Sequence, residues 1–203
     1  MSYKPLQACE VLPLLDFEPR WMLDCGPGDG HEWEVFRGRW PGVRLLGLEP
    51  SPAAFERLQG RFPGTLMRAA AWDRETRLLL LNPNSLLQGR LAAASAPASG
   101  ADWLVSTDEP VLAQCFSLDF LATFLGPFED AFLWADVEGA ELQVLQGAEK
   151  LLRSGAVRGI NIEVHPWRAE MLDAHLQERG FRQVFRYVDE GTHWDALYLW
   201  RGA

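Results

Sequence analysis

Residues 23–30 read LDCGPGDG, and this glycine-rich stretch decides how the rest of the chain is interpreted. An apolar run that begins at Trp21 leads into Asp24, and the segment after the glycines can open as a helix over 31–39. A strand, a glycine-rich turn and a helix in this order form a ligand cradle, because the N–H groups at a helix start can hold an anionic group. Glycine also tolerates positive φ and lets a ligand approach the backbone closely.

The spacing of the glycines indicates which ligand this turn would hold. Gly26, Gly28 and Gly30 stand at alternate positions. A dinucleotide fingerprint G-x-G-x-x-G that began at Gly26 would need a glycine where His31 stands, so a nicotinamide-dependent reductase is disfavoured. Asp24 could accept from an α-amino group and the glycine amides could meet a carboxylate, which favours S-adenosylmethionine (SAM). Such a turn also occurs as a plain tight connection, so the interpretation needs a second element.

That second element is Glu49, which ends an apolar run over 43–48. In nucleotide-binding α/β domains, an acid at this place accepts from two vicinal ribose hydroxyls. The alternative is a structural carboxylate near the start of the next helix. Ser51 would be the N-cap of that helix, with Pro52 as its first residue. We interpret Glu49 as a ribose ligand, with Ser51 beside it in the cofactor site.

Apolar strands and helices alternate along most of the chain and predict a single α/β domain over 1–203. Strands are expected over 21–25, 43–48, 65–71, 78–81, 132–135, 157–164, 181–188 and 194–200, and helices over 31–39, 118–125 and 167–179, after Ser51, and from 141 to Gly155. The sheet should be mostly parallel, with helices on both faces and a C-terminal antiparallel hairpin. Residues 1–20 are interpreted as an N-terminal cap, and 82–110 as a lid, because such a long loop is seldom a plain connection.

Composition argues against several kinds of partner. The 203 residues carry a net charge of −9, which disfavours a nucleic-acid backbone or an anionic membrane. Cys9, Cys25 and Cys115 are too few and too scattered for a disulfide framework or a zinc site. The sequence has neither a signal peptide nor a stretch of the roughly 20 apolar residues that cross a membrane. These features predict a cytoplasmic protein with reduced thiols.

Several polar residues stand where the expected strands end, which is where ligands bind in parallel sheets. Ala71 would leave room for a flat adenine, and Asp73 could accept from its exocyclic amine, although both also suit an ordinary turn. The run DVEGAE, residues 136–141, follows the strand over 132–135, and His165 follows the strand over 157–164.

Four motifs resemble the FkbM family of SAM-dependent methyltransferases. The run LWADVEGAELQVLQGAEKLL, residues 133–152, resembles the hallmark of that family, and the similarity extends over about 21–200. GLEPSPAAFERL (47–58), SLDFL (117–121) and IEVHP (162–166) resemble its ribose-binding strand and helix, its segment before the fourth strand and the end of its fifth strand. The resemblance implies a Rossmann-like methyltransferase domain with a seven-stranded sheet, and methyl transfer to a hydroxyl, commonly of a sugar or a natural product.

Methyl transfer to an alcohol needs a group that takes the acceptor proton in the transition state. We expect His165 to be this base, because an ordinary imidazole pKa of about 6.5 lets it accept a proton near neutral pH. Asp136 and Glu138 would orient the acceptor or the imidazole, and Asp136 would also border the cofactor. Alternatively, Asp136, Glu163 and His165 could together hold Mg²⁺ or Mn²⁺. Glu141 is interpreted as an anchor of the helix N-terminus.

Two departures from the family pattern bear on the function. Gly26-Pro27-Gly28 stands where the family usually has Gly-Ala-Asn, and Trp134 stands where it often has Lys. The second departure keeps a catalytically silent SAM-binding protein open as an alternative. The expected partner is a small-molecule acceptor such as a saccharide or polyketide, while the oligomeric state stays open.

Overall fold

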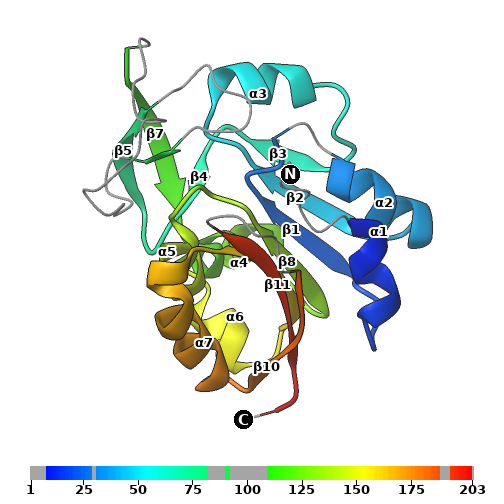
Figure 1. Ribbon diagram of the computed structural model, residues 1–203. Coiled ribbons are helices and arrows are strands. Elements are labelled where there is room, and N and C mark those ends of the chain that lie inside the picture. Colours follow the sequence, from blue (N-terminus) through cyan, green and yellow to red (C-terminus); the bar gives the residue numbers. More distant parts are fainter. Residues whose placement is uncertain (1–7, 29–30, 82–89, 92–108, 188–192, 203) are drawn as a thin grey trace.

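The computed structural model describes residues 8–28, 31–81, 90–91, 109–187 and 193–202. Its main sheet has seven strands in the order β10-β11-β9-β8-β1-β2-β3 (Figure 1). They are β1 (Trp21–Cys25), β2 (Arg44–Leu48), β3 (Thr65–Met67), β8 (Ala131–Ala135), β9 (Val157–Val164), β10 (Phe181–Tyr187) and β11 (Trp194–Trp200). The first five of these run parallel, whereas β11 runs antiparallel to both β9 and β10. The predicted mostly parallel seven-stranded sheet with its antiparallel hairpin is therefore confirmed.

Helices cover both faces of this sheet, because its central strands are apolar on both sides. In β8, Leu133 joins the core cluster on one face, whereas Phe132 and Trp134 join the cluster on the other. The first face carries α4 (Leu118–Leu125), α5 (Glu141–Gln146), α6 (Glu149–Arg153) and α7 (Ala169–Gln177), the last preceded by the 3₁₀ helix η3 (Pro166–Arg168). The second face carries α1 (Ala8–Val11), α2 (His31–Arg39) and α3 (Pro52–Leu58), with the 3₁₀ helix η1 (Leu12–Leu14) after α1.

The switch point of the sheet lies at β1, which pairs with β2 on one side and with β8 on the other. Cys25 stands level with Leu48 and with Ala135, so the three carboxyl ends meet at one edge. The backbone there is tied together by hydrogen bonds from Gly26 N to Leu48 O (3.0 Å) and from Asp136 N to Cys25 O (3.1 Å). Ligands of open α/β sheets bind at such a point.

The strand predicted over 65–71 is wrong, because the chain turns at Ala69 and divides it into two. Ala69 N donates to Met67 O, and β4 (Ala70–Ala71) then leaves β3 to pair with β7. A second sheet, in the order β4-β7-β5-β6, is built from β4, β5 (Thr76–Leu81), β6 (Arg90–Leu91) and β7 (Val111–Phe116). The run TLMRAAA, residues 65–71, gave no sign of this exchange between sheets.

The helix predicted from 141 to Gly155 is divided into α5 and α6. At Gly147 an added Cβ would lie 1.9 Å from Trp72 O, so the break is where the second sheet approaches the helix closely. The carboxylate of Asp119 accepts from Lys150 N (2.9 Å) and Leu151 N (3.1 Å), and it thereby caps the start of α6.

Two further expectations concern the ends and loops of the chain. In the N-terminal cap, Ala8 and Val11 pack in one cluster with Trp33 and Phe36 of α2. The lid predicted over 82–110 lies largely outside the described residues. Among the described residues, no helix combines the length and the apolar character that a membrane crossing requires.

Candidate active site

Asp24 is a buried carboxylate at the switch point of the sheet. It is 1% exposed, and neither of its oxygens has a hydrogen-bond partner among the described residues. Burial raises the pKa of Asp24 well above its ordinary value, and the nearby charges of Glu32 and Glu49 raise it further. An unpaired buried carboxylate is costly, so this arrangement fits a ligand that brings a cationic hydrogen-bond donor to β1.

Glu49 joins the glycine turn to the start of α3. Its Oε2 accepts from Gly28 N (3.2 Å) and its Oε1 from Ser51 N (2.7 Å). Burial raises the pKa of Glu49 to about 7, although both N–H donors oppose the shift. Ser51 Oγ accepts from Ala54 N (3.2 Å), which confirms the predicted N-cap. Carboxylate oxygens can each accept more than one hydrogen bond, so this structural role leaves room for a diol ligand.

The fold itself requires a glycine at position 26 of the turn. Gly26 has φ of +86°, and a Cβ added there would lie 2.0 Å from the backbone oxygen of Asp136. Gly28 also has positive φ, at 53°. Gly30 lies outside the described residues. The close approach at Gly26 brings the ends of β1 and β8 together, which is what places Asp24 and Asp136 at one edge.

Replacing Gly26 with Ala should therefore destabilise the protein. A non-glycine residue in the left-handed region costs about 1–2 kcal/mol, and overpacking against backbone typically adds about 1–3 kcal/mol. Chemical denaturation should show a loss of roughly 2–5 kcal/mol. Gly38→Ala is the control, because Gly38 is an exposed residue of α2 with nothing within 4 Å of an added Cβ. That variant should gain about 0.5–1 kcal/mol, and equal effects of the two substitutions would contradict the close approach.

Ala71 and Asp73, which are expected to border adenine, lie at the beginning of the second sheet. Ala71 is buried in β4. Asp73 Oδ2 lies 3.1 Å from a guanidinium nitrogen of Arg74, while its Oδ1 is buried and has no hydrogen-bond partner among the described residues. Because the expected strand is divided, Ala71 belongs to β4 and Asp73 follows it in the chain. Contact of these two residues with adenine stays a prediction.

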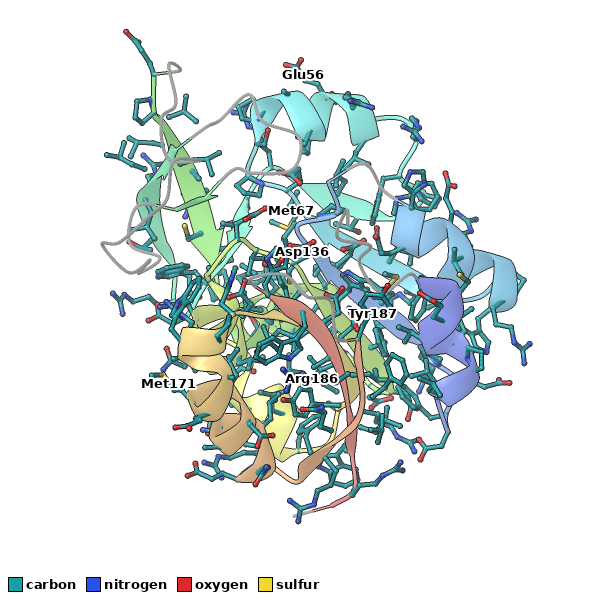
Figure 2. All side chains as sticks on the ribbon, in the orientation of Figure 1. Glu56, Met67, Asp136, Met171, Arg186 and Tyr187 are labelled. Atoms are coloured by element: carbon teal, nitrogen blue, oxygen red, sulfur yellow. The ribbon has the colours of Figure 1, made fainter. Side chains whose placement is uncertain are left out.

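Asp136 follows β8 and keeps a solvent-exposed side chain at the ends of the strands (Figure 2). Desolvation by the surrounding protein raises its pKa well above the ordinary value, and Glu163 and Glu138 add repulsion. Glu138 itself has φ of 54°, a left-handed conformation that non-glycine residues seldom adopt outside functional turns.

His165 contacts Glu163, and both residues belong to the IEVHP run at the end of β9. Its Nε2 is 3.2 Å from Glu163 Oε2, and its ring stacks on Trp167 with 4.4 Å between centroids. The other oxygen of Glu163 is 3.3 Å from His193 Nε2, so one carboxylate lies between two imidazoles. His165 Nδ1 is buried and has no hydrogen-bond partner among the described residues. Nε2 therefore faces the carboxylate, and Nδ1 is the nitrogen left for a ligand.

Opposing effects set the pKa of His165. Desolvation alone would lower it, but the carboxylates of Glu163, Glu141 and Glu138 together raise it above the ordinary value.

Glu141 is fully buried, and its Oε1 accepts from Gly139 N at 2.8 Å, which agrees with an anchoring role at the start of α5. Burial and the charge of Glu163 raise the pKa of Glu141 to about 7.

The candidate metal ligands differ from those predicted. One ligand atom each from Glu141, Glu163 and His165 lie within 4.8 Å of one another. Asp136 does not belong to this group among the described residues, because its side chain is exposed whereas Glu141 reaches inward from the first turn of α5. A carboxylate pair with an imidazole has the chemistry to hold a divalent cation.

Two residues near the site were missed from the sequence. The antiparallel pairing of β11 with β9 sets Asp195 opposite Glu163, and it is 5% exposed. His193, just before β11, contacts the same carboxylate of Glu163. The signal was the predicted C-terminal hairpin, but its register against the rest of the sheet could not be inferred from the pattern.

Solved structures show the same fold. The chain is similar to the crystal structure of methyltransferase FkbM from Methylobacillus flagellatus KT, with a TM-score of 0.62 and 18% identity over 93% of this chain and 46% of that chain. It is also similar to precorrin-6y C5,15-methyltransferase from Geobacter metallireducens GS-15, with a TM-score of 0.53 and 12% identity over 96% of this chain and 86% of that chain. At these identities, the likeness shows a Rossmann-like methyltransferase fold.

Comparisons of sequence identify the protein family. Trans-aconitate 2-methyltransferases from Methylobacterium radiotolerans and Escherichia coli O1:K1 / APEC are 34% and 31% identical over 85 residues, which is 40% of this chain and 33% and 34% of theirs. The chain thus spans about a third of the length of these curated relatives. The family model described as the methyltransferase FkbM domain matches residues 24–183. The chain therefore belongs to the FkbM family of methyltransferases, and S-adenosylmethionine is the cofactor that this membership indicates.

Proposed function

We propose that this protein is a SAM-dependent O-methyltransferase that acts on a hydroxyl of a small-molecule acceptor, such as a saccharide or polyketide. The observation that carries the proposal is the unpartnered buried carboxylate of Asp24, beside Glu49 at the switch point of the sheet. FkbM family membership supports methyl transfer, and the His165–Glu163 pair supplies a group suited to an alcohol.

The residues at the switch point fit this cofactor. Asp24 would accept from the α-amino group, and the turn at Gly26 and Gly28 would face the carboxylate. Glu49 would accept from the ribose hydroxyls, with Ser51 fixing the start of α3 beneath it. Two further residues, Ala71 and Asp73, would border the adenine. When bound, SAM supplies an electrophilic methyl group for an in-line displacement.

The acceptor would lie between Asp136 and His165. The protein must hold the acceptor oxygen in line with the methyl group and remove its proton. His165 Nδ1 would take this proton, because Nε2 faces Glu163, which stabilises the imidazolium that forms. Asp136 and Glu138 would orient the acceptor hydroxyl.

The test is methyl transfer from isotopically labelled SAM to a panel of acceptors, followed by mass spectrometry. Sugars and polyketides belong in the panel, and trans-aconitate does as well because two relatives are named for it. Calorimetric titration with SAM and with NAD distinguishes a methyltransferase, which should bind SAM, from a nicotinamide-dependent reductase, which should bind NAD. SAM binding without turnover on any acceptor would favour a catalytically silent SAM-binding protein.

Replacing Asp24 with Asn should stabilise the ligand-free protein at pH 8 and weaken SAM binding. The folded state raises the pKa of Asp24 through burial, so it holds the proton more tightly than the unfolded state. The stability contribution is therefore fully present below the unfolded pKa and is lost as the pH rises through the folded pKa. Asn cannot ionise, so the variant should lose less thermal stability than the wild type between pH 5 and pH 8.

Asp119→Asn is the matched control, because the carboxylate of Asp119 accepts from two backbone N–H groups. This variant should have a lower Tm than the wild type at pH 8. A lower Tm for Asp24→Asn at the same pH would show that its carboxylate is stabilising, and that the site is not poised for a cationic ligand.

A further inference from the structure

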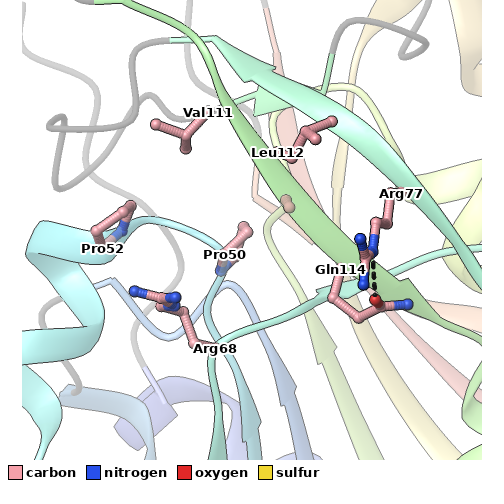
Figure 3. A pocket seen from close by; sticks show the side chains of 8 residues that line it. Pro50, Pro52, Arg68, Arg77, Val111, Leu112 and Gln114 are labelled. Carbon is pink, nitrogen blue, oxygen red and sulfur yellow. Dashed lines mark hydrogen bonds between the residues drawn. The ribbon is translucent and has the colours of Figure 1, made fainter.

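A pocket of about 370 Å³ lies beside the segment that follows Glu49 at the end of β2 (Figure 3). Its walls come from three places: the Pro50–Pro52 segment after β2, the connection between β3 and β4, and the paired strands β5 and β7. The lining residues are Pro50, Pro52, Arg68, Arg77, Val111, Leu112, Ala113 and Gln114. The volume suits a small molecule.

The polar part of this pocket is cationic. Arg68 and Arg77 line it, and no carboxylate is among its described lining residues, although the whole chain carries a net charge of −9. Arg68 is exposed and makes no ion pair or hydrogen bond with the described residues. Arg77 donates through Nε to Gln114 Oε1 at 3.2 Å, so its partner is neutral and both terminal nitrogens stay available (Figure 3). Guanidinium groups in such a setting are suited to carboxylates and phosphates.

The remaining wall is apolar and held on a rigid scaffold. Arg77 stands directly opposite Gln114 in the antiparallel pair β5–β7, and Leu112 lies on the same face two residues along. Leu112 is 67% exposed, and the two prolines face it across the pocket (Figure 3). Cys115 of β7 is not among the lining residues and packs into a core cluster, which supports the pocket wall from behind.

We propose that this pocket binds a small molecule that carries an oxyanion, a carboxylate or a phosphate, on a hydrophobic body. The oxyanion pairs with Arg68 and with the terminal nitrogens of Arg77, and the body packs against Leu112 and the prolines. The lining includes neither Asp24 nor Glu49, but Pro50 and Pro52 flank Ser51, so the pocket adjoins the residues proposed to hold SAM.

Calorimetric titration of the full chain with benzoate, phenyl phosphate and benzyl alcohol tests this proposal. The two anions should bind, and the neutral alcohol should bind at least about tenfold more weakly, because hydrogen bonds to charged groups carry the recognition. The ratio between benzoate and phenyl phosphate identifies which oxyanion the site prefers. Equal affinity for the alcohol and the anions, or no binding of either anion, would overturn the proposal.

Matched variants locate the site. Arg68→Gln and Arg77→Gln should each weaken anion binding by about tenfold or more, whereas Arg57→Gln, an exposed arginine of α3 outside the pocket, should not change it. The titration is repeated with saturating S-adenosylhomocysteine, and anion affinity should be retained. Loss of anion binding under that condition would show that the pocket belongs to the cofactor site. Equal losses of affinity in all three variants would show that the anions respond only to the net charge of the protein and not to this pocket.

Discussion

Replacing His165 with Ala is expected to lower kcat by about 10²–10⁴-fold, which is the usual contribution of a positioned acid or base. SAM affinity should hardly change, because His165 follows β9 and contacts Glu163 near the end of that strand, whereas Asp24 lies in β1 and Glu49 follows β2. Single-turnover rates and calorimetric titration on the same preparation separate the two effects. His175→Ala is the control, since His175 is a half-buried imidazole of α7 near Glu149 and outside the site.

The pH profile gives a second readout of the same proposal. Only the neutral imidazole can accept a proton, so kcat should fall as the pH falls through the pKa of His165. Because the neighbouring carboxylates raise that pKa against the effect of desolvation, the acidic limb should lie above the ordinary value of about 6.5. Glu163→Gln should move the limb to lower pH, since it removes the carboxylate that lies 3.2 Å from Nε2.

Other outcomes assign the chemistry elsewhere. If chelation stops turnover in the wild type and Mg²⁺ restores it, Glu141, Glu163 and His165 hold a metal, and His165 is not the base. If Asp136→Asn is inactive while His165→Ala keeps most of its turnover, Asp136 takes the proton. A His165→Ala protein that is less stable but turns over normally would limit this imidazole to packing on Trp167.

Much of the main sheet follows from local patterns in the sequence. The strand at 157–164 and the helices at 31–39 and 118–125 were predicted with their observed bounds, because local runs of the sequence mark them, and the structure shows Ser117 as the N-cap of α4. The second sheet was not predicted, since β4 and β6 have two residues each, and β4 and β5 both pair with β7 across more than thirty residues of chain. Pairing at that separation depends on tertiary contacts that a single apolar run does not encode.

The candidate site divides in the same way. Asp24 and Glu49 were found because parallel strands bring their carboxyl ends to one edge, whatever the details of packing. The neighbours of Glu163 depend instead on the register of β11 against β9, which is why His193 and Asp195 were missed. Replacement of Asp136 by Glu141 in the candidate metal cluster has a related cause, since α5 turns Glu141 inward.

Replacing Glu49 with Gln should weaken SAM binding at pH 8 by about 1–3 kcal/mol, or roughly 5–150-fold, because the ribose hydroxyls lose a charged partner. The wild type should also bind SAM about tenfold more weakly at pH 6 than at pH 8. Burial raises the pKa of Glu49 to about 7 without ligand, and hydroxyl donors favour the ionised carboxylate, so binding near this pH must release a proton.

Calorimetry in buffers of different ionisation enthalpy counts that proton, and the Glu49→Gln protein should release less of it than the wild type. Glu56→Gln is the matched control, because Glu56 is an exposed carboxylate of α3 (Figure 2) and should leave both the affinity and the pH dependence unchanged. Unchanged SAM affinity in Glu49→Gln at pH 8 would confine Glu49 to its contacts with Gly28 and Ser51, as a carboxylate that joins the glycine turn to α3. A retained pH dependence in that variant would instead assign the titration to Asp24, whose pKa is raised by the same burial.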